Sequence, residues 1–191
     1  MKSFELVDIN VSSDVGDVSA LSKDARQALV RALNLGGRRV TGLATTEVAS
    51  RYFISKGQAK KSMVPMKRAT VENPVAVIRS VGSVISLYHF RTNPKTPPSN
   101  RVPSLNVAVK RGEGMKPLPG AFIAKHANND ALGVFIRRGS ARLPIDKKYG
   151  PSVPGMLKNE QIVERLEDNA TEWVANYFDG EMLKSLQRRG K

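Results

Sequence analysis

The stretch SKDARQALVRALNLGGRRV, Ser22–Val40, decides how the chain begins to fold. Ser22 is a good helix N-cap residue, and the helical pattern that follows meets Gly36-Gly37, resumes at about Val40 and continues to Phe53. Because two adjacent glycines often mark a kink or a turn, the sequence predicts a pair of helices with a break at this point. The apolar residues that recur at helical spacing in the first helix are Ala25, Ala28, Leu29, Ala32 and Leu33.

The two ends of the chain show different periodicities. Residues 1–21 alternate loosely between apolar and polar side chains, which predicts a strand or an extended arm. After Pro154-Gly155 helical spacing returns, with acidic residues opposite the apolar face, so residues 158–191 are expected to form an amphipathic helix and a basic tail. The apolar face of this helix comprises Ile162, Leu166, Ala170, Trp173 and Tyr177.

The middle of the chain contains short apolar runs typical of strands. Gly82-Ser83 is expected to form a turn between two of these runs, and Arg91–Asn100, RTNPKTPPSN, to form a loop. The sequence thus predicts an α+β fold in which a small antiparallel β-sheet is flanked by an N-terminal helix pair and a C-terminal amphipathic helix. The expected core is 22–157, with an extended loop at 91–101. The candidate strands are 69–71, 75–81, 84–90, 105–110, 121–125 and 132–137.

Charge is the strongest compositional signal. The chain has 31 Lys and Arg against 17 Asp and Glu, a net charge of +14. A field of this sign favours polyanionic partners such as nucleic acid, or an acidic protein surface. Between residues 38 and 68 there is one acid, Glu47, whereas a merely solvated helix face usually carries both signs. The candidate residues facing DNA or an acidic neighbour are Arg38, Arg39, Arg51, Lys56, Lys60, Lys61, Lys67 and Arg68.

Motifs for catalysis and cofactor binding are missing from the sequence. There is no cysteine, and His89 and His126 have no second ligand at metal-binding spacing. No phosphate-binding loop, dinucleotide-binding fingerprint or nucleophile elbow occurs. We therefore predict no catalytic, cofactor-binding or metal-binding residues, and a chain that is not an enzyme. No apolar run is long enough for a membrane span, so a soluble protein is expected.

The segment RLPIDKKYGPSVPGML, Arg142–Leu157, is unusually rich in proline. Residues before proline favour extended conformations, so Leu143 and Val153 are expected to stay out of helices. The segment is therefore predicted to be a stiff corner that aims the last helix relative to the sheet. Tyr149 is expected to be a packed anchor with a hydrogen-bonded hydroxyl.

This same segment closely resembles part of the bacteriophage minor tail protein Z family, found in lambda-like phages and prophages. Further matching segments follow in the same order and spacing, and the resemblance extends over about residues 20–157. The first arm and the last helix match only in character. The other segments are ALSKDARQALVRALNLGGRRV at 20–40, KRATVENPVAVIRS at 67–80, PGAFIAKH at 119–126 and GVFIRRGSARLPI at 133–145.

The resemblance implies a structural virion protein at the head-proximal end of the tail, assembled in the host cytoplasm, that completes the tail and supports its joining to the head. It also implies the fold of tail-completion and neck proteins, with copies forming a homo-oligomeric ring around the DNA channel, expected to be a hexamer. The implied partners are other tail and neck proteins and, non-specifically, genomic DNA. The alternative is a non-specific nucleic-acid-binding protein acting outside the virion. Candidate residues for an intersubunit contact are Pro144, Tyr149, Pro151 and Pro154.

Overall fold

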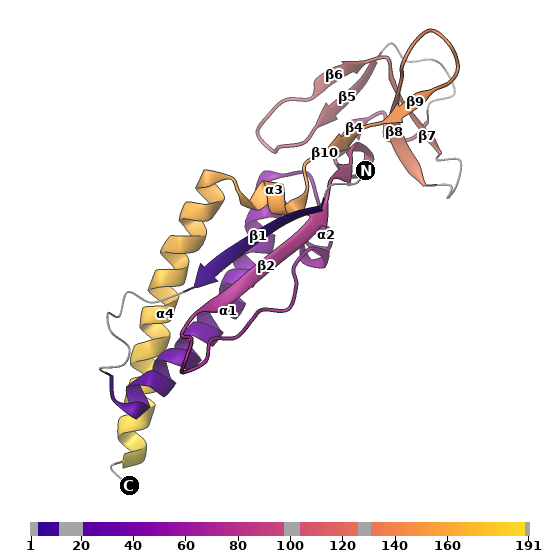
Figure 1. Cartoon of the computed structure of the whole chain (residues 1–191). Coiled ribbons are helices and arrows are strands. Elements are labelled where there is room, and N and C mark those ends of the chain that lie inside the picture. The colour runs from indigo at the N-terminus through magenta and orange to yellow at the C-terminus, as the bar shows by residue number, and fades with distance from the viewer. Residues whose placement is uncertain (1–3, 12–20, 98–103, 126–130, 190–191) are drawn as a thin grey trace.

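The computed structural model describes residues 4–11, 21–97, 104–125 and 131–189, which form an elongated α+β molecule (Figure 1). The predicted α+β class is confirmed, with four α-helices and several small antiparallel sheets in the described residues. The helices are α1 (Lys23–Arg51), α2 (Lys56–Lys61), α3 (Val153–Leu157) and α4 (Glu160–Arg189). The strands are β1 (Phe4–Val11), β2 (Ala76–Ser83), β3 (Ile85–Ser86), β4 (Arg91–Asn93), β5 (Ser104–Ala108), β6 (Lys116–Pro119), β7 (Ala121–Lys125), β8 (Leu132–Arg137), β9 (Ile145–Lys147) and β10 (Tyr149–Gly150).

The two long helices and one long β-ribbon form the first part of the molecule. Helices α1 and α4 run antiparallel, side by side, and the β1–β2 pair lies beside them (Figure 1). β1 and β2 are antiparallel over their full length, from Phe4 opposite Ser83 to Val11 opposite Ala76. The expected amphipathic character of the last helix is confirmed, because Ile162 and Leu166 are buried against α1 and the core.

Helix α1 is continuous from Lys23 to Arg51, so the predicted break at Gly36-Gly37 is wrong. The two glycines instead allow close packing on two sides of one helix. A Cβ atom at Gly36 would lie 2.8 Å from Cγ2 of Val174 in α4, and one at Gly37 would lie 2.5 Å from Sδ of Met66. Side chains at these positions would overlap their neighbours, and the physical reason for the glycine pair is therefore interhelical and interlayer contact.

The expected hairpin around Gly82-Ser83 is also wrong. Both residues lie inside β2, which pairs with the N-terminal strand β1. Of the run 84–90, only Ile85–Ser86 is a strand, and the run 69–71 contains no strand. The loop predicted over 91–101 begins later than expected, because Arg91–Asn93 forms β4 and pairs with β5. Residues 98–101 of that loop lie outside the described residues.

The remaining strands form the second part of the molecule, at the end away from the C-terminus (Figure 1). Two three-stranded antiparallel sheets, β4-β5-β6 and β7-β8-β9, make up most of it, and β10 pairs with β3. Phe90 and Leu105, each 1% exposed, lie in the same buried cluster as the residues of α1 and α4. One hydrophobic core therefore extends through both parts.

The segment Arg142–Leu157 has more regular structure than the predicted corner. It contains β9, β10 and α3, and β9 returns to the sheet by pairing with β8, Ile145 opposite Arg137. The expectation that Val153 stays out of helices is wrong: Val153 and Pro154 open α3, because proline is tolerated in the first turn of a helix. Tyr149 is 43% exposed, so it is not a packed anchor within the chain.

Candidate functional site

Helix α2 presents three of the predicted basic residues. It begins with a capping box, in which the Ser55 hydroxyl accepts a hydrogen bond from the Gln58 backbone N–H and the Gln58 side chain accepts one from the Ser55 backbone. Ala59 is fully buried and faces the core. The three lysines are exposed around it: Lys56, Lys60 and Lys61.

The chain after α2 lies along the free side of β2. Backbone bridges join Met63 to Ser80 and Lys67 to Val77, and the latter pair exchanges two hydrogen bonds of 2.9 and 3.0 Å. The side chains at the end of this segment, Lys67 and Arg68, are exposed. Together with the three lysines of α2 they are the exposed cations of one continuous segment, called the basic edge and defined as Lys56, Lys60, Lys61, Lys67 and Arg68.

Helix α1 holds the basic edge in place. The Asn34 side chain donates to the Ala69 carbonyl (3.1 Å) and accepts from the Ala69 N–H (2.9 Å). It thus makes the two hydrogen bonds that a neighbouring strand would make with Ala69, the residue after Arg68. Met66 packs where Gly37 leaves room on α1. The basic edge is thus anchored by α2 at one end and by Asn34 at the other, and its charges are presented on a fixed backbone.

The other three predicted basic residues belong to α1. Arg38 is exposed. The Arg39 guanidinium lies 4.3 Å from the centre of the Trp173 ring and donates to the Tyr177 hydroxyl (3.2 Å), both on α4. Arg51 is bound within the chain, as described next. The structure therefore gathers five of the eight residues into one surface and uses Arg39 and Arg51 to join the two long helices.

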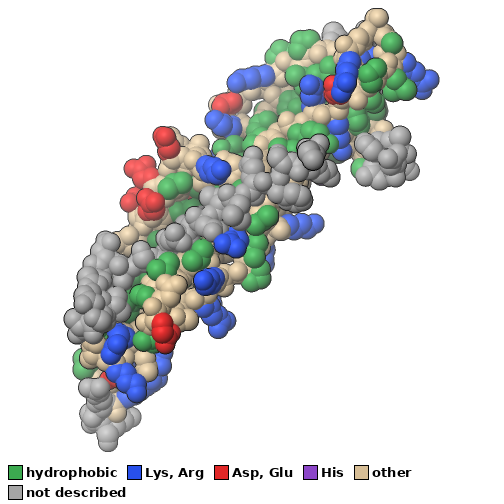
Figure 2. Space-filling view, in the orientation of Figure 1, with side chains coloured by type: hydrophobic (Ala, Val, Ile, Leu, Met, Phe, Trp, Pro, Cys, Tyr) green, Lys and Arg blue, Asp and Glu red, His purple; other side chains and the backbone are tan. Residues whose placement is uncertain are grey.

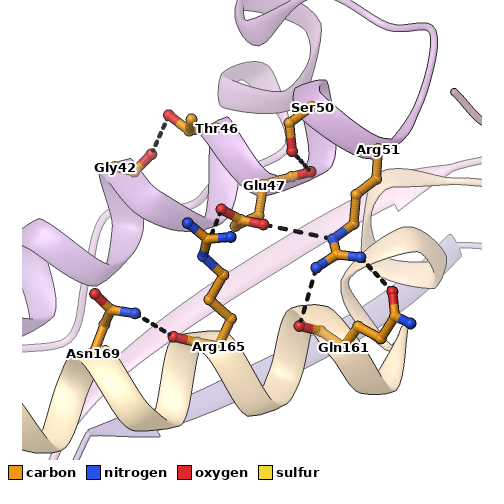
Figure 3. Close-up of polar contacts among 8 residues, drawn as sticks. All are labelled: Gly42, Thr46, Glu47, Ser50, Arg51, Gln161, Arg165 and Asn169. Carbon is orange, nitrogen blue, oxygen red and sulfur yellow. Dashed lines mark hydrogen bonds and ion pairs between the residues drawn. The ribbon is translucent and has the colours of Figure 1, made fainter. Parts of the chain in front are cut away.

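Glu47, the single acid in the basic run, is buried between α1 and α4 (Figure 3). Its carboxylate lies 3.1 Å from Nε of Arg165 on α4 and 3.5 Å from Nε of Arg51. Arg51 also donates to the side-chain oxygen of Gln161. This cluster was not predicted from the sequence. Glu47 lies on the same helical face as the buried Val40 and Ala44, and that spacing is the signal that places it inward.

An open pocket of about 580 Å³ lies where the end of α1 meets the start of α4, and cationic side chains line it. Arg111 donates to the carbonyls of Ala49 (3.1 Å) and Tyr52 (3.3 Å), which end α1. Lys110 lies 3.5 Å from Glu113. These cations stabilise the helix end and neighbouring turn, so the pocket is explained by the fold. In the described residues no group of His, Cys, Asp and Glu could hold a metal ion, and His126 lies outside them.

The residues predicted to contact another subunit differ in exposure. Pro144 is exposed and follows Leu143, whose exposure is 67%. Tyr149 is exposed, with the Lys147 ammonium 5.8 Å from its ring centre. Pro154 is buried in α3, and Pro151 is half-buried. Pro144 and Tyr149 are therefore the two that a partner could reach.

Comparison with known proteins gives one match. The family model for prophage minor tail protein Z matches residues 11–190, which include α1, the basic edge, both sheets of the second part and α4. No curated protein and no solved structure matches the chain. Within the described residues, none of the helices has the length and apolar character needed to cross a membrane.

Proposed function

Because the chain belongs to the prophage minor tail protein Z family, we propose that it completes the phage tail at its head-proximal end and supports the joining of tail and head. The family itself gives a structural role in the phage tail. The position at the head-proximal end and the joining step are our extension. In this role the chain would act as an assembly surface, with no catalytic step.

The charge distribution supports a place next to the DNA channel. The chain has a net charge of +14, and the five side chains of the basic edge are exposed on a backbone held by Asn34 and β2. Such charges attract phosphates without reading base sequence, which suits a protein that lets any genome pass. Copies arranged in a closed ring would surround the channel, with six copies matching a sixfold tail tube.

The test is a phage or prophage lacking this chain. We expect electron microscopy to show tails of normal length that do not join heads, and an added copy of the wild-type gene to restore joining. Complementation with Lys60→Glu, Lys61→Glu should restore fewer joined particles than wild type. The matched control, Lys23→Glu, Arg188→Glu, makes the same change in net charge at exposed sites away from the basic edge and from the other proposed contacts. Normal joining without the protein would refute the proposal.

The same basic edge favours the second candidate, a non-specific nucleic-acid-binding protein that acts outside the virion. This function requires tight binding of duplex DNA by the isolated chain. If the five side chains contact phosphates, the slope of log K against log salt concentration should be about −4 to −5. Weak binding by the isolated chain, with failure of head joining in its absence, would favour the tail function.

A further inference from the structure

The exposed face of α4 carries a row of acidic residues. Their successive spacings are four, three, one and four residues, which places them on one side of the helix, opposite the buried Ile162 and Leu166. Figure 2 shows acidic side chains gathered over the first half of α4. We define this acidic stripe as Glu160, Glu164, Glu167, Asp168 and Glu172, all exposed.

From this face we infer that copies of the chain dock head to tail, with the acidic stripe of one copy against the basic edge of the next. The inference deepens the proposed function and rests on it in one respect, since it requires several copies of the chain side by side in the tail. It identifies the acidic neighbour of the basic edge as a second copy of this chain.

Both surfaces carry charged side chains that form no ion pair within the described residues. Several other acids in the described residues are paired: Glu47 with two arginines, Glu113 with Lys110 and Lys116, Asp146 with Arg138, and Glu181 with Arg31 and Lys184. Within the same described part of the chain, the acidic stripe and the basic edge have no side-chain ion pair or hydrogen bond. Five carboxylates and five cations therefore remain for an external partner. The cation next to the stripe, Arg165, is already bound to Glu47.

Their placement prevents the two surfaces from meeting within one molecule. α4 lies on one side of α1, whereas α2 and the segment beside β2 lie on the other side (Figure 1). A contact between different surfaces of identical subunits is heterologous, and repetition of such a contact gives a closed ring or a filament. The arrangement of charge in this chain thus fits the ring of the proposed function better than it fits a two-fold dimer.

The two surfaces are comparable in length along the chain. Glu160 and Glu172 are twelve residues apart on one helix, a distance of about 18 Å. The basic edge extends from Lys56 to Lys60 in α2, about 6 Å. It then follows β2 from the position of Ser80 to that of Val77, about 10 Å. Several carboxylate–cation pairs could form at once without bending either element.

The test is a charge swap in the full-length protein. The stripe variant is Glu164→Lys, Glu167→Lys, Asp168→Lys, and the edge variant is Lys60→Glu, Lys61→Glu, Lys67→Glu. Wild-type protein should self-associate in sedimentation velocity at about 50 mM NaCl and dissociate at about 500 mM, because screening weakens contacts between exposed charges. Each variant alone should associate at least about tenfold more weakly. An equal mixture of the two should regain association, since each reversed surface then meets an opposite charge.

A single charge reversal in the stripe, Glu167→Lys, is compared with a matched control on the same helix, Asp179→Lys. Asp179 is exposed on the same helix, about 10 Å beyond the stripe, so its reversal should leave association close to wild type. The substituted side chains are all exposed, and circular dichroism should show unchanged helix content in every variant.

Three outcomes would overturn the inference: wild-type protein that stays monomeric at low salt, variants that associate as well as wild type, or a mixture that does not recover. Loss of DNA binding in the edge variant, with self-association unchanged, would identify DNA as the occupant of the basic edge. Any of these results combined with failed head joining in the deletion phage would leave the proposed function standing and remove only this contact.

Discussion

Two glycines of α1, Gly36 and Gly42, allow a quantitative test of the packing between the long helices. Alanine is favoured over glycine in a helix by about 1 kcal/mol. A Cβ at Gly42 would have no atom within 4 Å. Gly42→Ala should therefore raise the free energy of unfolding by about 1 kcal/mol.

Gly36→Ala adds the same methyl group where there is no room for it. The new Cβ would lie 2.8 Å from Cγ2 of Val174 and 3.9 Å from its backbone nitrogen. Val174 is 4% exposed, and a β-branched side chain in a helix has little freedom to rotate away. Overpacking of this kind costs about 1–3 kcal/mol. Taking about 2 kcal/mol and the same propensity gain, we expect Gly36→Ala to lower the free energy of unfolding by about 1 kcal/mol.

The measurement is urea and thermal unfolding of both variants, followed by circular dichroism. A difference of about 2 kcal/mol between them corresponds to a difference in Tm of about 4–8 °C for a chain of this size. Adding Val174→Ala to Gly36→Ala should cost less than the sum of the two single changes, because the overlapping methyl group is gone. Equal stabilisation by Gly36→Ala and Gly42→Ala would refute the close approach of α1 and α4.

Three further predictions concern single side chains. Glu47→Gln should lower the free energy of unfolding by about 1–2 kcal/mol, because it removes the buried carboxylate between Arg51 and Arg165; the loss is limited because both arginines can partly rehydrate. The same change at the exposed Glu164 should alter this free energy little, and equal effects of the two changes in urea unfolding would contradict the cluster. Hydrogen bonding by Lys184, and then by Arg31, holds the pKa of Glu181 below its ordinary value. The stability that Glu181 contributes is thus present above the unfolded-state pKa of about 4.3 and is lost as the pH falls through the lower folded-state pKa. In acid, the Tm of Glu181→Gln should therefore depend less on pH than the Tm of the wild type. An equal pH dependence of the two Tm values would count against the pairing. Tyr149→Ser should leave Tm unchanged because the ring is exposed, yet reduce head joining in the complementation assay; a fall in Tm would show that the residue is structural.

Local signals in the sequence predicted the long helices, apart from the break at Gly36-Gly37, because each helix buries a stripe of apolar residues against the other. The same signals predicted the acidic outer face of α4, whereas the short helix α2 was not predicted. The strand pairing was less accessible. Gly82-Ser83 suggests a hairpin when read locally, but the partner of β2 is β1, about seventy residues earlier in the chain. Whether such a segment forms a local turn or pairs with a distant strand depends on the tertiary fold, and a short stretch of sequence does not carry that information.

The glycine pair and Glu47 show a second limit. Gly36-Gly37 was interpreted through backbone freedom, whereas the missing side chains serve two neighbours that lie 138 and 29 residues away, Val174 and Met66. Glu47 was counted as a charge, whereas its role depends on Arg165 of another helix. The sequence predicted the basic residues of the basic edge together with Arg39 and Arg51. Only the positions of α4 and β2 show that Arg39 and Arg51 bind α4, whereas the basic edge follows β2.

The contact of α1 with α4 at Gly36 and with the basic-edge segment at Gly37 fixes the thickness of the subunit at one level. There the α1 backbone packs directly against the side chains of Val174 and Met66, which keeps the distance from the acidic stripe to the basic edge short. In a ring built by joining these two surfaces, that distance is the width of each repeating unit, and together with the angle between the surfaces it sets how many copies close the circle. The absence of side chains at Gly36 and Gly37 would then be one of the features that set the bore of the ring.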